Sequence, residues 1–138
     1  PEVRSLDCFE IDLRAIEPAR RNLGNVMVPV RPRLHWKDVT AGVGRAQYDC
    51  IVMNPPFHEG RDAEPELGLK FIAAAATALK RQGELWLVAN RQLPYEALLE
   101  EMFAEAALVV EKHGFKVLRA TGVRDKVHAA GNWRRKRR

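Results

Sequence analysis

The chain has 138 residues, of which 46% are hydrophobic and 30% are charged, a composition typical of one packed domain rather than of a disordered segment. Its formal net charge is +5, and residues 134–138 carry five positive charges, so residues 1–133 are neutral overall. No apolar stretch reaches the roughly 18–20 residues of a membrane span, and no signal-peptide core opens the chain. We therefore expect a cytoplasmic protein without a membrane anchor.

The N-terminal part predicts a strand followed by a helix. Residues 3–11 mix apolar and acidic side chains in a strand-like pattern. Asp12 can cap a helix that runs to about Leu23, with Gly24 as its end. Pro18 lies inside that helix and removes one backbone donor, so the helix either kinks there or begins near it.

Two further strands are predicted before the middle of the chain. Residues 33–36 (RLHW) indicate a short strand, and residues 48–53 (YDCIVM) indicate a buried strand. The two cysteines, Cys8 and Cys50, lie in apolar runs 42 positions apart, without the spacing of a metal site or a disulfide framework. We expect both thiols to be reduced and buried, although the sequence leaves a single bridge between them open.

The second half continues the alternation of helix and strand. Residues 65–81 predict a helix, Gly83 follows it, and residues 84–90 (ELWLVAN) predict an apolar strand. Pro94 opens another helix, and two strand-like halves around His113-Gly114 predict an antiparallel hairpin. The apolar side chains expected on the two helices are Leu67, Phe71, Ile72, Ala75 and Leu79, and Leu98, Leu99, Met102 and Phe103. This alternation predicts the α/β class.

The tetrapeptide Asn54-Pro55-Pro56-Phe57 directly follows a predicted strand. Each proline fixes φ near −65° and pushes the preceding residue out of the helical region, so the segment is stiff and extended. The Asn54 side-chain oxygen and the Pro55 carbonyl can then converge on one amino group with two hydrogens. Phe57 offers a face on which a flat base can stack. The alternative is a rigid turn whose phenylalanine packs in the core.

An acid stands at the end of the first predicted strand. In open α/β sheets, ligands bind beyond the carboxyl ends of the strands, and Glu10 at such an end can accept hydrogen bonds from both hydroxyls of a ribose. Asp12 stands where a helix cap is needed, so we assign it that role. Four scattered histidines form no metal-binding spacing, and we expect no metal site.

The run IVMNPPFHEG resembles motif IV of the class I S-adenosylmethionine-dependent methyltransferases, and is most similar to that of the bacterial ribosomal RNA guanine-N2 methyltransferases. The similarity extends through EIDLRAIEPARRNL, GELWLVANRQLPY and GFKVLRA, and so covers nearly all of residues 3–121. The resemblance implies a Rossmann-like sheet whose last two strands form the antiparallel hairpin.

The resemblance also implies roles for individual residues. Glu10 corresponds to the acid that binds the cofactor ribose, and Asp38 to the acid that meets the adenine amino group, although Asp38 could equally be an exposed loop acid. Asn54, Pro55, Pro56 and Phe57 correspond to the amine-binding catalytic motif, with Asn54 also near the cofactor.

One family feature is missing from the sequence. The family's domain begins with a strand that ends in a glycine-rich loop, whereas this chain begins at what would be the second strand. We therefore expect residues 1–121 to be a methyltransferase-like catalytic domain lacking its first strand, and residues 122–138 to be a basic tail. The tail either binds phosphate or is an unstructured solubilising end.

The sequence thus predicts transfer of a methyl group from S-adenosylmethionine to the N2 amine of a guanine in ribosomal RNA or the small ribosomal subunit. Two alternatives stay open. One is an inactive methyltransferase-like module that binds RNA, and the other is N-methylation of adenine or of a protein glutamine.

Overall fold

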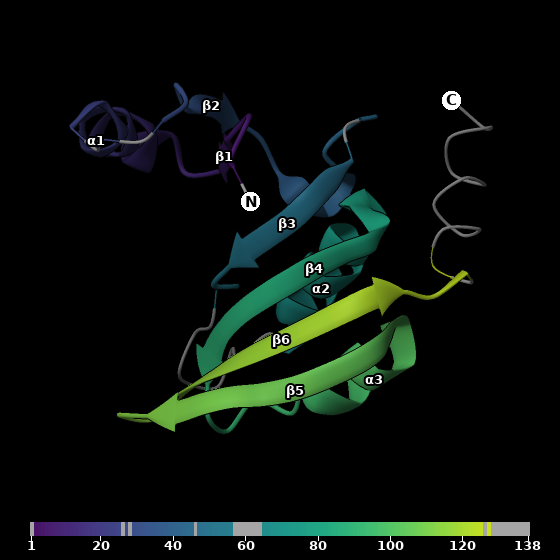
Figure 1. The fold of residues 1–138 in the computed structure, drawn as a ribbon. Coiled ribbons are helices and arrows are strands. Elements are labelled where there is room, and N and C mark those ends of the chain that lie inside the picture. Colours follow the sequence, from purple (N-terminus) through teal and green to yellow (C-terminus); the bar gives the residue numbers. More distant parts are fainter. Residues whose placement is uncertain are drawn as a thin grey trace. The chain divides into compact units, whose positions relative to one another are not determined.

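The computed structural model describes residues 2–25, 27, 29–45, 47–56, 65–125 and 127. The chain divides into two compact units, Pro1–Ala41 and Gly42–Arg138 (Figure 1). Among the described residues, no helix is long and apolar enough to cross a membrane.

The first unit is a strand, a helix and a second strand. Its elements are β1 (Asp7–Glu10), α1 (Leu13–Gly24), β2 (Arg33–Trp36) and a 3-10 turn, η1 (Val39–Ala41). The two strands are parallel and paired along their whole length, so they form a β-α-β arrangement. The carboxyl ends of both strands consequently lie at one edge.

The sequence predicted this unit well except for the length of β1. Asp12 is the N-cap of α1, as expected, and the helix continues through Pro18 to Gly24. Residues 33–36 form β2 as predicted. The first strand, however, covers only Asp7–Glu10 rather than residues 3–11, because β2 offers just four residues for pairing.

The second unit is a four-stranded sheet with two helices. Its elements are β3 (Tyr48–Met53), α2 (Pro65–Ala78), β4 (Leu79–Asn90), α3 (Glu96–Met102), β5 (Phe103–Lys112) and β6 (Phe115–Val123). The strand order is β3-β4-β6-β5, with β3 and β4 parallel and the other pairs antiparallel. The mixed α/β sheet with an antiparallel C-terminal hairpin confirms the predicted fold class.

The core lies between this sheet and its helices. In the view of Figure 1, α2 and α3 lie behind the sheet. Leu85 and Leu87 of β4 and Leu118 of β6 face them and are essentially inaccessible to solvent, as are Ile72 of α2 and Leu99 of α3. Alternate residues of β4 and β6 point inward, as the twofold repeat of a β-strand requires.

The predicted hairpin is confirmed. β5 and β6 are joined by His113 and Gly114, whose φ values of 53° and 80° are both positive. Two positive φ angles are typical of the two-residue turns that match the twist of paired strands. The register shifts between Leu108 and Val110, so Val109 forms a bulge in β5.

Two helix ends were predicted too late. α2 ends at Ala78, not at residue 81, because fully buried Leu79 already pairs with Tyr48 and regular pairing of β4 resumes at Glu84. Between them the chain passes Gly83, where a Cβ would lie only 3.0 Å from the Tyr48 carbonyl oxygen. Likewise Phe103 is not a helical residue but the buried first residue of β5.

The prediction that β3 and both cysteines are buried was wrong. Val52 is 74% exposed, Cys50 is exposed and Cys8 is half-buried. β3 is the end strand of its sheet, and one of its faces points away from α2 and α3, so apolar composition did not translate into burial. Both thiols are free, as expected, and partial burial raises the pKa of each.

Candidate active site

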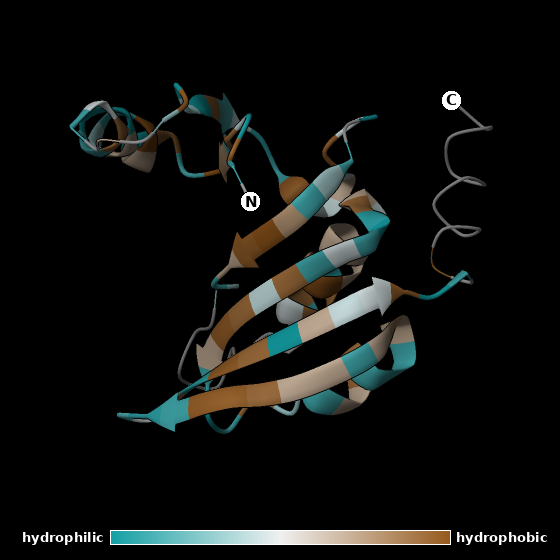
Figure 2. Cartoon of the chain, viewed as in Figure 1, coloured by the Kyte–Doolittle hydropathy of each residue, from teal (hydrophilic) through white to brown (hydrophobic). Residues whose placement is uncertain are grey.

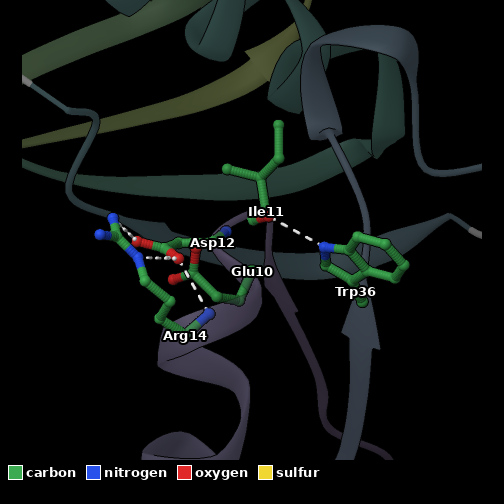
Figure 3. Close-up of polar contacts among 5 residues, drawn as sticks. All are labelled: Glu10, Ile11, Asp12, Arg14 and Trp36. Atoms are coloured by element: carbon green, nitrogen blue, oxygen red, sulfur yellow. Dashed lines mark hydrogen bonds and ion pairs between the residues drawn. The ribbon is translucent and has the colours of Figure 1, made fainter.

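Glu10 closes β1 and is held in place by its neighbours (Figure 3). Its carboxylate oxygen Oε1 accepts a hydrogen bond of 2.7 Å from the Asp12 backbone N–H. Its own carbonyl accepts one of 2.8 Å from the Lys37 N–H. The half-buried carboxylate is therefore oriented, and among the described residues nothing engages its second oxygen, Oε2.

Asp38 lies at the same edge, two residues after the end of β2. Its Oδ1 atom accepts hydrogen bonds from the Thr40 N–H at 2.8 Å and the Thr40 hydroxyl at 2.7 Å. These bonds lower the pKa of this exposed carboxyl. Because Glu10 pairs directly with Trp36 across the two strands, the structure brings the two predicted cofactor-binding acids to one edge.

Asn54, Pro55 and Pro56 follow the carboxyl end of β3 in the second unit. Asn54 and Pro56 are exposed, whereas Pro55 is buried, so the segment is anchored by one proline. Among the described residues, no group donates a hydrogen bond to the Asn54 side chain or the Pro55 carbonyl. Within the described part of the chain, both acceptors are therefore unoccupied. Phe57, the last residue of the motif, lies outside the described residues.

Comparison with known proteins identifies the family. The sequence profile of the methyltransferase small domain matches residues 1–119. The chain belongs to this methyltransferase family. It is 34% identical over 122 residues to the ribosomal RNA large subunit methyltransferase G of Alcanivorax borkumensis, which covers 88% of this chain and 31% of that protein.

Two other similar proteins act on ribosomal RNA by name. The ribosomal RNA small subunit methyltransferase C of Acinetobacter baylyi is 36% identical over 121 residues, covering 86% of this chain and 34% of that protein. The 16S rRNA N2 G1207 methyltransferase of T. thermophilus, solved with AdoMet and guanosine, superimposes with a TM-score of 0.72 at 30% identity, covering 86% of this chain and 31% of that one. This chain therefore spans about a third of the length of the relatives it matches.

One contact beside Glu10 was not foreseen from the sequence of this methyltransferase domain. Trp36 donates from its indole Nε1 to the Ile11 carbonyl at 2.9 Å, and both side chains are more than half exposed. Apolar surface thus lies directly next to the oriented acid. The available signal was the tryptophan at the end of RLHW, whose indole N–H needs an acceptor.

Asp12 acts as the expected helix cap rather than as a ligand. Its Oδ1 accepts from the Arg14 N–H at 2.9 Å, and its Oδ2 pairs with the Arg14 guanidinium at 2.7 Å. The hydrogen bonds from the Arg14 side chain and backbone lower the pKa of Asp12 to about 2. Both of its oxygens are occupied, which leaves Glu10 as the available acid at the end of β1.

The end of β4 adds a pinned loop beside Asn54. The Asn90 side chain accepts from the Gln92 N–H at 3.1 Å, and the Arg91 N–H donates to the Gly114 carbonyl at 2.9 Å. The Arg91 side chain lies 3.6 Å from Glu111 and is 61% exposed. The Arg91 guanidinium is therefore largely accessible at the end of β4.

A buried lysine contacts the start of α3, directly after the segment that follows β4. Lys116 is only 4% exposed, and its ammonium contacts Glu96 in the first turn of α3 at 2.6 Å. Burial alone would raise the pKa of Glu96, but the hydrogen bond and charge of Lys116 lower it. Nothing in the sequence distinguished this lysine from a surface one.

Tyr95, the residue before α3, is buried against α2. Its side chain is 2% exposed and packs so closely on α2 that a Cβ at Gly68 would overlap its hydroxyl. Burial raises the pKa of Tyr95. Leu93 and Tyr95 are both buried, so the segment between β4 and α3 is packed into the core.

Proposed function

We propose that this protein is the catalytic part of an S-adenosylmethionine-dependent methyltransferase that modifies the N2 amine of guanine in RNA. The observation that carries the proposal is the segment after β3, where exposed Asn54 stands next to buried Pro55 with both acceptors unoccupied among the described residues. A rigid pair of acceptors at a strand end suits an exocyclic amine, which has two hydrogens to donate.

The proposed role of Asn54 and Pro55 is to orient that amine. When the Asn54 side-chain oxygen and the Pro55 carbonyl accept its two hydrogens, the nitrogen becomes less planar and its lone pair turns away from the protein. Pro56 keeps the backbone extended, and Phe57 supplies the stacking face for the base. Because the acceptors need not reorganise during the reaction, alignment and electrostatics provide the rate.

The chain's acids fit the nucleoside half of the cofactor. Glu10 has one carboxylate oxygen held by Asp12 N–H and one available, which suits the hydroxyls of a ribose. Asp38 is an ionised acceptor at the same edge, which suits the adenine amino group. When bound, S-adenosylmethionine supplies an electrophilic methyl group. The chain contains no glycine-rich loop that would back its methionine half.

Guanine in ribosomal RNA is the substrate that the relatives support. The T. thermophilus protein is named as an N2 G1207 methyltransferase and was solved with guanosine, and the curated relatives are ribosomal RNA methyltransferases. We assign catalysis to residues 1–121 and regard residues 122–138 as a basic tail. Its first residues belong to the fold, since β6 extends to Val123, and Val123 and Val127 are buried in the core. A ribosomal substrate places the protein in the cytoplasm.

The test is methyl transfer from radiolabelled S-adenosylmethionine to guanine-containing RNA, using protein expressed from the complete reading frame. We expect Asn54→Ala to lower kcat about 100-fold, the typical effect of losing one catalytic hydrogen-bonding group. The matched control is Gln82→Ala, which removes an exposed amide from the opposite end of the same sheet.

The outcomes separate the competing functions. Equal single-turnover rates for parent and Asn54→Ala would remove Asn54 from the mechanism. Methylation of adenine or of a glutamine peptide in preference to guanine would replace the substrate. Binding of RNA without any transfer would favour an inactive module.

A further inference from the structure

Three side chains line up across three strands at the edge where β3 ends. Phe115 at the start of β6 stands directly opposite Asn90 of β4 on one side and Lys112 of β5 on the other. Directly opposed residues point to the same face of a sheet. The row therefore runs Lys112, Phe115, Asn90. It lies on the face opposite to the buried side chains of Ala89 and Lys116, because neighbouring residues of a strand point to opposite faces.

This row borders an apolar floor. Two residues further from the edge, the same face carries Val110, Val117 and Val88, which also oppose one another. Phe115 is 51% exposed and Val110 is 48% exposed. Figure 2 shows the hydrophobic stretch of β5 ending in the hydrophilic residues at its tip. An exposed aromatic ring with apolar side chains behind it offers a flat surface rather than a closed pocket.

Positive charge surrounds the ring. Lys112 is exposed, and among the described residues it has no acidic partner. Arg91 is tied to the hairpin by the bond from its N–H to the Gly114 carbonyl. Its guanidinium, 61% exposed, is only loosely paired with Glu111 at 3.6 Å. The hairpin tip thus presents two accessible cations beside Phe115.

The location relates this surface to the candidate active site. Met53 pairs with Leu87, so Asn54 leaves β3 at the edge where β4 ends in Asn90. β6 is two strands from β3, about 10 Å at the usual spacing between strands. The hairpin tip is therefore within reach of the nucleotides that neighbour a base held at Asn54.

We propose that the tip of the β5–β6 hairpin, defined by Arg91, Lys112 and Phe115, binds the single-stranded RNA that flanks the target guanosine. The proposal rests on the proposed function. An exposed aromatic ring stacks an unpaired base of any identity, and flanking cations pair with phosphates, which is the chemistry of single-strand binding. An apolar protein partner would not require the two cations.

The test is the affinity of the whole chain for a short fluorescein-labelled single-stranded RNA with one guanosine among uridines, followed by anisotropy. We expect Phe115→Leu to weaken binding at least about fivefold, the lower limit for losing one base stack. Phe115→Tyr keeps the ring and should keep the affinity. Lys112→Gln should reduce the slope of log K against log salt by about 0.7, the value for one phosphate contact on a single strand.

Matched controls separate this surface from general attraction. Lys70→Gln removes an exposed lysine from α2 and should leave the slope unchanged. The basic tail is identical in every variant, so its contribution cancels when the affinity of each variant is divided by that of the parent chain. Thermal melting by circular dichroism verifies that each variant is folded, which is expected because Phe115 is half exposed.

Three results would overturn the proposal: no RNA binding by the parent chain, unchanged affinity of Phe115→Leu, or equal losses for Phe115→Leu and Phe115→Tyr. The failure of the proposed function has a different signature. If Phe115→Leu loses RNA affinity but the complete protein transfers no methyl group, the RNA-binding surface is supported and the proposed reaction is refuted. If methyl transfer depends on Asn54 but not on Phe115, the proposed reaction is supported and the RNA-binding role of the hairpin tip is refuted.

Discussion

The two units of the chain are stabilised in different ways. In residues 42–127 as described, the sheet and its helices enclose a continuous core that includes fully buried Phe103, Leu85 and Leu87. In the first unit, no described apolar residue from 2 to 41 is buried. The acids proposed to bind the cofactor thus lie on a unit without a core of its own, and the proposed amine-binding segment lies on the unit that has one.

Polar contacts replace the missing core in the first unit. The Asp7 side chain is 6% exposed and receives two hydrogen bonds from the Arg33 guanidinium, at 2.8 and 2.9 Å. His35 contacts the same carboxylate at 2.8 Å and stacks on Phe9, with ring centroids 4.9 Å apart. Interactions of this kind contribute less than burial of large apolar side chains. We therefore expect the first unit to open more readily than the second.

The largest effect is expected from a cavity in the second unit. Phe103→Ala removes a fully buried ring and should lower the free energy of unfolding by about 3–5 kcal/mol. Ile16→Ala in α1 removes a half-buried side chain and should lower it by only about 1 kcal/mol. Urea unfolding measures both, and hydrogen exchange of amides in β4 and β1 assigns each loss to a unit. Equal losses would contradict the contrast between the units.

A glycine-to-alanine substitution in each unit gives a second comparison of how tightly the two units are packed. Gly68→Ala would drive a methyl group into the Tyr95 hydroxyl, and we expect a loss of about 1–3 kcal/mol from overpacking. Gly24→Ala meets nothing within 4 Å in the last turn of α1 and should stabilise by up to about 1 kcal/mol. Thermal melting of both variants decides this. A neutral Gly68→Ala would mean that the contact between α2 and Tyr95 yields easily.

The smallest effect concerns the cap of α1. Because the Arg14 hydrogen bonds favour ionised Asp12 and lower its pKa from 3.8 to about 2, this carboxylate stabilises the folded unit at higher pH. Its contribution declines as the pH falls below about 4 and is lost near pH 2. Carbon-13 NMR titration should show the low midpoint, and Arg14→Gln should raise it. A midpoint near 4 in the parent chain would show that the Arg14 contact does not form.

Local signals in the sequence predicted most of the fold. A capping residue at Asp12, a two-residue turn at His113-Gly114 and the strand before Asn54 all act within a few residues, so they could be recognised without tertiary context. Burial could not. Val52 and Cys50 have the composition of a core strand, but β3 lies at the end of its sheet. Leu79 continues a helical pattern, yet it is taken into the sheet by pairing with Tyr48.

The candidate site was predictable to the extent that it lies at strand ends. Glu10 and Asn54 were predicted at strand ends, and the structure has Glu10 as the last residue of β1 and Asn54 directly after β3. Asp38 was suggested by the family resemblance alone. Lys116 and Trp36 could not be found this way, since their neighbours Glu96 and Ile11 are about 20 or more positions distant.

The bulge at Val109 has a consequence for how the protein behaves in concentrated solution. Leu108, Val109 and Val110 are each about half exposed on β5, the last strand of its sheet. A straight strand of this composition would be a template on which further chains could add and grow into fibres. The extra residue at Val109 bends the strand and interrupts its row of backbone donors and acceptors. A shortened chain without Val109 would present an uninterrupted edge and should become prone to form amyloid.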